Sequence, residues 1–142
     1  MTLTQRARQV FADDTYATQC TGINIDNVEP DCTTCSLPIG NSHRNAKGAV
    51  MGGVIFTLAD FAFAIAANTE CLTLPDNAET KLQWVSSSST IHFLGNTKGN
   101  TLTASTLCLK KGQRQSLYQI TVSDNDGRTI AIVTTAGTKI PD

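Results

Sequence analysis

Several features that would place a sequence in a functional class at once are absent or scarce in these 142 residues. Basic and acidic residues nearly balance, at 11 and 12, so the basic surplus that is typical of nucleic-acid-binding proteins is missing. No Gly-x-Ser-x-Gly motif occurs, which argues against a serine hydrolase triad. Histidine occurs only twice, at His43 and His92. We therefore expect no nucleic-acid partner and little imidazole chemistry.

The N-terminus and the number of cysteines indicate the cellular compartment. The first ten residues contain no apolar stretch of signal-peptide length, and five cysteines cannot all pair within one chain. We therefore predict a cytoplasmic protein with reduced thiols. Cys32 and Cys35 have a spacing seen in metal and redox pairs, but on a strand their side chains would face opposite ways and no second pair follows. We expect two packed thiols, no metal and no cofactor.

One apolar run is long enough to be compared with a membrane span. Residues 49–67 are almost entirely apolar, and a span needs roughly 20 such residues. Asp60 lies near the middle of this run, where a charge costs about 2.5 to 3.5 kcal/mol on insertion scales. Because the rest of the chain has the pattern of strands and turns, we predict a buried core helix and no membrane partner.

The order of elements predicts a single α+β domain over residues 1–142. The long helix, 54–68, divides a half with a short helix and two strands from a half with four strands joined by turns rich in glycine. No linker and no internal repeat interrupts the chain. We expect an antiparallel sheet curled around the long helix. The other elements expected are a helix over 4–12, with Thr4 as N-cap, and strands over 23–28, 32–39, 83–94, 101–110, 116–123 and 129–138.

Asp60 is the only charged residue between Lys47 and Glu70. A carboxylate buried without a partner is costly, and no residue within one helical turn carries a positive charge. Thr57, three residues earlier, can offer a hydroxyl on the same face of the helix. Asp60 is either hydrogen-bonded to a distant group for structural reasons or is a functional carboxylate.

The residues that precede the helix favour the functional alternative. The pair Gly52-Gly53 allows close approach of a ligand to backbone N–H groups that can hold an oxyanion, and Asn45 lies in the loop before it. Gly52 and Asp60 are eight residues apart, or about 12 Å along one helix axis. One substrate carbonyl cannot reach both groups on the same helix. We therefore predict an obligate dimer with active sites at its interface.

The segment from Asn45 to Asp60, which reads NAKGAVMGGVIFTLAD, resembles the hotdog-fold thioesterases, and most of all their phenylacetyl-CoA thioesterase subfamily. The resemblance implies a hotdog fold that hydrolyses acyl-CoA without a metal or redox cofactor. It also implies that Asp60 is the general base or nucleophile, that the Gly52 N–H is the oxyanion hole, and that Asn45 holds the water or the carbonyl region. Family members are usually dimers that pair into tetramers.

Two departures from the family pattern concern the substrate. Met51 stands where the family has a histidine, and Gly95-Asn96 stands where relatives often have Arg-Pro. The β-hairpin that contains Lys111 and Arg114 falls where relatives often contact the CoA phosphates, although a solvated turn also explains these charges. The residues that we expect at the substrate are Gly53, Met51, Thr57, Thr90, Lys111 and Arg114.

Two other functions remain open at this point. A hotdog enoyl-CoA hydratase or dehydratase would need a catalytic histidine, which only His43 or His92 can supply. A module that binds acyl-CoA without cleaving it would be consistent with Met51 in place of the family histidine. The sequence leaves the acyl group and the choice between dimer and tetramer undetermined.

Overall fold

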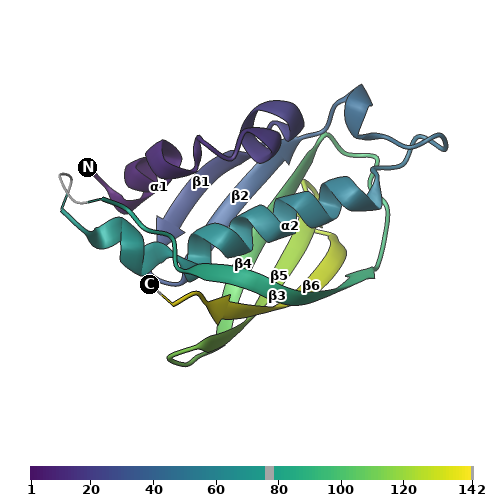
Figure 1. Cartoon of the computed structure of the whole chain (residues 1–142). Coiled ribbons are helices and arrows are strands. Elements are labelled where there is room, and N and C mark those ends of the chain that lie inside the picture. Colours follow the sequence, from purple (N-terminus) through teal and green to yellow (C-terminus); the bar gives the residue numbers. More distant parts are fainter. Residues whose placement is uncertain (76–78, 142) are drawn as a thin grey trace.

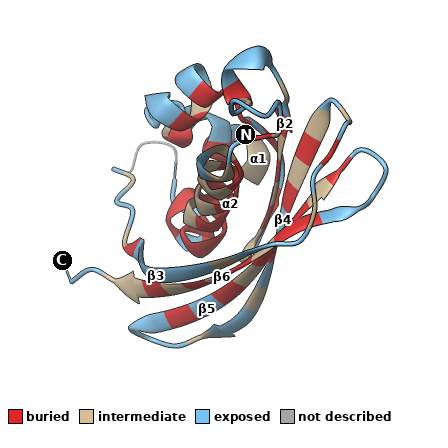
Figure 2. Ribbon diagram, turned by 90° about the vertical axis from the view of Figure 1, so that its right-hand side faces the viewer, coloured by how far each residue is buried: buried red, intermediate tan, exposed pale blue. Residues whose placement is uncertain are grey.

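Helix α2, Gly52–Ala67, lies along the concave side of one six-stranded antiparallel sheet. The computed structural model describes residues 1–75 and 79–141. The strand order is β1-β2-β4-β5-β6-β3, and the sheet curls around the helix (Figures 1 and 2). The strands are β1 Asn24–Glu29, β2 Cys32–Pro38, β3 Trp84–Phe93, β4 Thr101–Lys111, β5 Gln115–Asp124 and β6 Thr129–Lys139. This is the predicted α+β hotdog architecture.

The helices differ from the predicted ones mainly at their ends. The N-terminal helix α1, Leu3–Phe11, begins earlier than expected, with Thr2 and not Thr4 as its N-cap. The reason is a capping box: Thr2 Oγ1 accepts the Gln5 N–H at 3.1 Å, while the Gln5 side chain accepts the Thr2 N–H at 2.8 Å. Three short helical segments were not predicted: the π-helix η1 Tyr16–Thr21 and the 3-10 helices η2 Asn41–His43 and η3 Thr69–Thr73.

The core lies between α2 and the inner face of the sheet. Tyr118, Ile120 and Val122 alternate along β5 and are fully buried, which confirms the predicted period of two. The Phe63 ring of α2 meets the Tyr118 ring edge-on, with 5.4 Å between ring centroids. A Cβ at Gly137 of β6 would lie 2.5 Å from Ser116 Oγ and 2.8 Å from the Phe63 ring, so the packing of α2 on the sheet requires glycine at this position.

The two edges of the sheet are covered to different extents. Near the β1 edge, α1 packs on the same side as α2, where the Phe11 and Phe61 rings meet at 6.0 Å (Figure 1). Strand β3 forms the opposite edge, and among the described strands it pairs with β6 alone. Among the described residues no strand pairs with the outer side of β3, and its residues Ser86–Ser89 are exposed.

The apolar run over residues 49–67 supplies the buried helix α2. Of the helices within the described residues, none has the length and apolarity that crossing a membrane requires.

Candidate active site

Asp60 lies in the middle of α2 with its side chain partly exposed. It borders a shallow cleft of about 370 Å³ between α2 and the segment that leads into η1. The stripe of α2 that the sheet leaves partly uncovered passes through Asp60, since Gly53, Thr57 and Ala64 on the same side are also exposed in part. The lining residues of the cleft are Asp14, Thr15, Tyr16, Ala17, Thr57, Asp60, Phe61 and Ala64.

The surroundings of Asp60 favour its protonated form. Burial raises the pKa of Asp60 above its usual value, a hydrogen bond from the Ser86 side chain opposes this shift, and the nearby carboxylate of Asp14 adds to it. Among the described residues that line the cleft, none is basic. Asp60 is therefore a carboxylate without an ion-pair partner in its cleft, and its basicity is higher than that of an exposed aspartate. Such a group suits proton abstraction near neutral pH.

Backbone N–H groups without helical partners lie at the start of α2. Met51 is the N-cap, and its carbonyl accepts the N–H groups of Val54 and Ile55 at 3.0 and 3.2 Å. The N–H groups of Gly52 and Gly53 precede the first helical hydrogen bond, and within the described residues no acceptor is seen for either. A Cβ at Gly53 would meet nothing within 4 Å, while one at Gly52 would lie 2.9 Å from the Phe93 ring. The helix start is therefore open to an anionic oxygen.

Asn45 organises the loop before this helix start. Its Oδ1 accepts the N–H groups of Lys47 and Ala49 at 3.0 and 3.1 Å, and its own N–H is donated to the Ala49 carbonyl at 2.8 Å. The side chain is exposed, and its oxygen is committed to the loop. The predicted contact of Asn45 with water or with the substrate carbonyl remains a prediction, which only its amide NH₂ group is left to make.

His43 is held inside the protein by both ring nitrogens. Its Nδ1 accepts the Gly40 N–H at 2.9 Å, so the proton resides on Nε2, which donates to the Thr21 carbonyl at 2.7 Å. The His43 carbonyl in turn accepts the Met51 N–H at 2.8 Å. His43 thus fixes the loop that leads to the helix start and has no free nitrogen for proton transfer.

The structure does not bring all the predicted substrate residues together. Thr57 lines the cleft with Asp60, but it donates its hydroxyl to the Gly53 carbonyl at 2.8 Å, so that proton is not offered to Asp60. Ile91 packs against the core, so its neighbour Thr90 points to the opposite face of the sheet, away from Asp60. Met51 is exposed beside Gly52. Gly52 and Asp60 remain about 12 Å apart along the helix axis.

The two candidate phosphate ligands have different surroundings. Lys111 Nζ forms an ion pair with Asp31 at 2.6 Å and donates to the Ala67 carbonyl at 3.2 Å, and its side chain is only 15% exposed. Arg114 is exposed in the β4–β5 hairpin and lines an open groove of about 870 Å³ with Gln83 and Lys139. Of the two, only Arg114 presents its charge to solvent.

Sequence reasoning missed two neighbours of Asp60. Ser86 reaches it from β3, and Asp14 reaches it from the segment before η1. Ser86 stood in a run of four serines with no feature to distinguish it. Asp14 stood beside Asp13 with no pattern that linked either to the long helix. Neither contact has a local signal, because both arise from segments far from Asp60 along the chain.

Comparison with known proteins identifies the family of this chain. A sequence profile described as the thioesterase superfamily matches residues 47–131, which include the glycine pair, Asp60 and Ser86. The chain belongs to the thioesterase superfamily. An acyl-coenzyme A thioesterase, PaaI of Escherichia coli, is 28% identical to this thioesterase-family chain over 129 residues, which are 90% of this chain and 84% of PaaI.

Solved structures show the same fold. The structure of E. coli PaaI, a protein of the phenylacetic acid degradation operon, superposes with a TM-score of 0.82 at 24% identity and covers 99% of this chain and 97% of its own. A hypothetical thioesterase protein from Streptococcus pneumoniae, solved with coenzyme A, gives a TM-score of 0.77 at 19% identity over 93% of this chain and 98% of its own. The hotdog fold and the family membership are therefore established for this chain.

Proposed function

We propose that this thioesterase-family chain hydrolyses acyl-CoA thioesters to a free acid and CoA. The observation that carries the proposal is the arrangement on α2. Within residues 1–75 and 79–141, the cleft of its carboxylate holds no basic group, and the two N–H groups at the helix start meet no acceptor. The likeness to an acyl-coenzyme A thioesterase and to a thioesterase solved with coenzyme A supports CoA esters as the substrate class.

In the proposed reaction the thioester carbonyl oxygen accepts the Gly52 N–H at the positive end of the helix dipole. Asp60 removes a proton from water as the water attacks the carbonyl carbon, or its carboxylate attacks that carbon directly. The tetrahedral intermediate then collapses, the C–S bond breaks, and the CoA thiolate leaves. In the first route the thiolate takes up the proton that Asp60 removed from water. In the second route the acyl group remains on Asp60 as a mixed anhydride, which a water molecule hydrolyses to the free acid and the regenerated carboxylate. The Ser86 hydroxyl, which lies beside Asp60 and favours its ionised form, would keep the carboxylate oriented.

We propose that each active site is shared between two subunits. The 12 Å separation along the axis prevents Asp60 and Gly52 of one helix from acting on one carbonyl. The open backbone edge of β3, together with exposed apolar Val85 and Phe93, provides a surface for a second copy. Two antiparallel α2 helices across such an interface would place Asp60 of one chain opposite Gly52 of the other.

A dimer of dimers has a separate candidate surface. Leu107, Leu109 and Leu117 lie exposed on β4 and β5, on the side of the sheet away from α2. We propose that this convex face joins two dimers. Light scattering on Leu117→Lys tests this proposal. We expect the mass of a dimer, with full activity retained, and an unchanged tetramer mass would exclude this face as the contact between dimers.

Two observations argue against hydratase chemistry in the same fold. Both ring nitrogens of His43 are hydrogen-bonded inside the protein, and His92 lies opposite Ile132 on the same outer side of β3 as Thr90. Neither imidazole is placed beside Asp60. An acyl-CoA-binding module remains the outcome to expect if a folded dimer binds acyl-CoA without releasing CoA.

The test combines activity with subunit mixing. Release of CoA from aromatic and aliphatic acyl-CoAs is followed with a thiol reagent for wild type, Asp60→Asn and Gly52→Pro, and for the two variants after joint refolding. Random pairing restores one intact site in each heterodimer, so about a quarter of the wild-type rate is expected. If both variants are folded and inactive alone and their mixture is also inactive, the shared active site is refuted. If the wild type releases CoA from none of the esters, the proposed thioesterase activity is refuted.

A further inference from the structure

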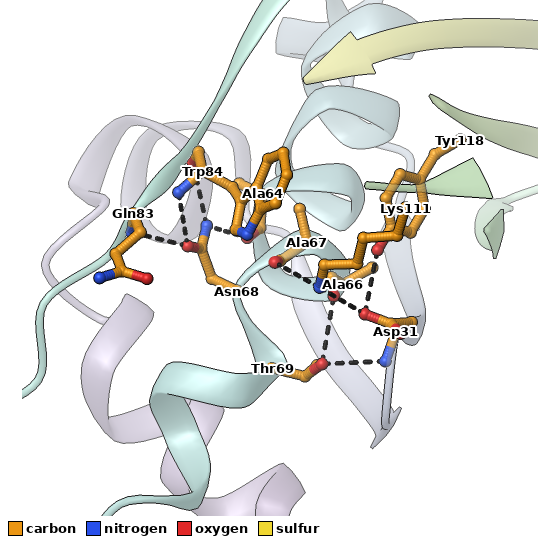
Figure 3. A network of polar contacts seen from close by, with 10 residues as sticks. All are labelled: Asp31, Ala64, Ala66, Ala67, Asn68, Thr69, Gln83, Trp84, Lys111 and Tyr118. Atoms are coloured by element: carbon orange, nitrogen blue, oxygen red, sulfur yellow. Dashed lines mark hydrogen bonds and ion pairs between the residues drawn. The ribbon is translucent and has the colours of Figure 1, made fainter. Parts of the chain in front are cut away.

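Asn68, the residue that ends α2, uses its whole side chain to hold the beginning of β3. Its Oδ1 accepts the N–H groups of Gln83 and Trp84, both at 2.9 Å. Its Nδ2 donates to the Trp84 carbonyl at 3.0 Å and to the Ala64 carbonyl at 2.8 Å. Asn68 is only 1% exposed, so these four hydrogen bonds satisfy every polar group of a buried amide (Figure 3).

The Asn68 amide replaces a missing neighbouring strand. With Trp84 it exchanges an N–H···O and a C=O···H–N hydrogen bond, which is the pattern of a ladder pair in an antiparallel sheet. β3 is an edge strand, and β6 is its one partner among the strands of the described residues. The Trp84 side chain is buried and lies beside Lys111, whose Nζ is 5.5 Å from the ring centroid. The first residue of β3 is thus fixed to the end of the helix that carries Asp60.

Ser86 follows Trp84 by two residues, and successive side chains of a strand alternate between its faces. Trp84 and Ser86 therefore share the face that is turned toward α2. On the helix, Asp60 and Asn68 are separated by about two turns, with Ala64 between them. We propose that Asn68 is a positioning residue, which latches the start of β3 to α2 so that the Ser86 hydroxyl stays in place beside Asp60. This inference rests on the proposed role of Asp60.

Thr69, the next residue, contacts a different part of the chain from Asn68. Its Oγ1 accepts the Asp31 N–H at 2.9 Å and donates to the Ala66 carbonyl at 3.3 Å. Figure 3 shows that Asn68 reaches Gln83 and Trp84, while Thr69 reaches the turn between β1 and β2. Both side chains are almost fully buried at the same helix end, but only Asn68 touches the strand that carries Ser86. Thr69→Val is therefore a matched control for loss of stability alone.

If Asn68 positions Ser86, replacing Asn68 should change the titration of Asp60, which loss of a purely structural contact would not do. Among the described residues the titratable groups at the Asp60 cleft are Asp14 and Tyr16 from the segment at η1, and β3 contributes the Ser86 hydroxyl. The Ser86 hydrogen bond lowers the pKa of Asp60 against the effects of burial and of Asp14. If β3 shifts, the Ser86 hydroxyl moves away from Asp60 and the titration of Asp60 moves to higher pH.

The experiment is a ¹³C NMR titration of the Asp60 carboxyl in the whole protein, with Asp60→Asn to assign the signal. Wild type is compared with Asn68→Ala, Ser86→Ala, the double variant and Thr69→Val. We expect the midpoint to move to higher pH in Asn68→Ala and in Ser86→Ala, and no further in the double variant, because both act through one hydrogen bond. Thr69→Val is expected to lower Tm without moving the midpoint. Asn68→Gln, which keeps the amide but misplaces it, replaces Asn68→Ala if the latter does not fold.

The proposal is overturned if the Asn68 variant leaves the midpoint unchanged, if the shifts of Asn68→Ala and Ser86→Ala add, or if Thr69→Val moves the midpoint equally. The acid limb of the kcat/KM profile for an acyl-CoA should follow the same order of variants. The NMR readout needs no turnover. A latch that behaves as expected in a protein without thioesterase activity would therefore refute the proposed function and leave the positioning role intact.

Discussion

The two ends of helix α2 are built in opposite ways. At the C-terminal end, side chains satisfy the backbone: Asn68 donates to the Ala64 carbonyl, and Lys111 donates to the Ala67 carbonyl while paired with Asp31. At the N-terminal end no side chain caps the helix, and the first two N–H groups belong to glycines without acceptors among the described residues. A closed end stabilises the fold, whereas an open end leaves donors and dipole for a ligand.

Asp60 lies between these ends and combines features of both. Like the groups at the C-terminal end it has a polar side chain beside it, in its case Ser86, yet it is only partly buried and borders an open cleft. Its raised pKa means that ionisation disfavours the folded state. Stability is therefore lost as pH rises through the ordinary Asp range toward the folded-state pKa, and the cost persists above it. A site that retains such a group gives up stability for reactivity.

The largest expected effect comes from removing the charge. Asp60→Asn should lower kcat for acyl-CoA hydrolysis by about 10²- to 10⁴-fold, the usual contribution of a general base. Because the ionised carboxylate is disfavoured in the folded state, Tm at pH 7 should not fall. Steady-state kinetics and thermal unfolding on the same preparation test both statements. A loss of activity together with a lower Tm would place Asp60 with the structural groups of the closed end.

The open end is tested next by deleting one N–H group. Gly52→Pro removes the donor at the first helical position, where proline is tolerated, and Met51 already has the extended conformation that precedes proline, with φ −61° and ψ 138°. We expect a fall in kcat of about 10²- to 10³-fold, as for loss of one oxyanion donor.

Gly52→Ala is the matched control for this variant, since it adds the same Cβ against the Phe93 ring but keeps the N–H. Its kcat should stay far closer to that of the wild type. Equal losses in the proline and alanine variants, measured by CoA release, would show that crowding at Phe93 and not the missing donor is responsible.

A substitution at the C-terminal end of α2 should change the free energy of unfolding rather than the rate of hydrolysis. Lys111→Met leaves the Ala67 carbonyl without its side-chain donor and removes the cation from Asp31, which still accepts the Tyr118 hydroxyl at 3.1 Å. The variant should lower the free energy of unfolding by about 1 to 2 kcal/mol. KM for acyl-CoA should be unchanged. Lys110→Met, at the exposed neighbouring position, is the control and should change neither quantity. Urea unfolding and KM together decide: a raised KM at constant stability would assign Lys111 to the CoA phosphates instead.

The smallest expected effect concerns the hydroxyl beside Asp60. Ser86→Ala removes the hydrogen bond that lowers the pKa of Asp60, so the acid limb of the kcat/KM profile should move to higher pH. At pH values well above that limb the rate should change far less than in Asp60→Asn. A pH-rate profile of the two variants beside wild type tests this. An acid limb that stays in place would mean that Ser86 does not control the ionisation of Asp60.

Much of the fold could be predicted because the relevant signals are local. The alternation of Tyr118, Ile120 and Val122 and the glycine-rich turns between strands indicated the four C-terminal strands, and all four were found within two residues of their predicted ends. The first helix was misplaced at its N-terminus because two threonines compete as caps, and the Gln5 side chain decides between them. The π-helix η1 has no recognisable local pattern and was missed.

For the candidate site, the sequence alone determined the residues that are unusual for their local sequence context. Asp60 is a charge within an apolar helix, and Gly52-Gly53 is a glycine pair at its start, so both could be singled out, and their separation along a helix follows from its fixed rise per residue. Only the tertiary structure decided that Ser86 and Asp14 lie near Asp60, that the Thr57 hydroxyl is donated to the Gly53 carbonyl, and that Lys111 pairs with Asp31. The contacts of Asp60 and of Lys111 join segments that are distant in sequence, and their partners are selected by how the sheet curls around α2, which no local pattern encodes.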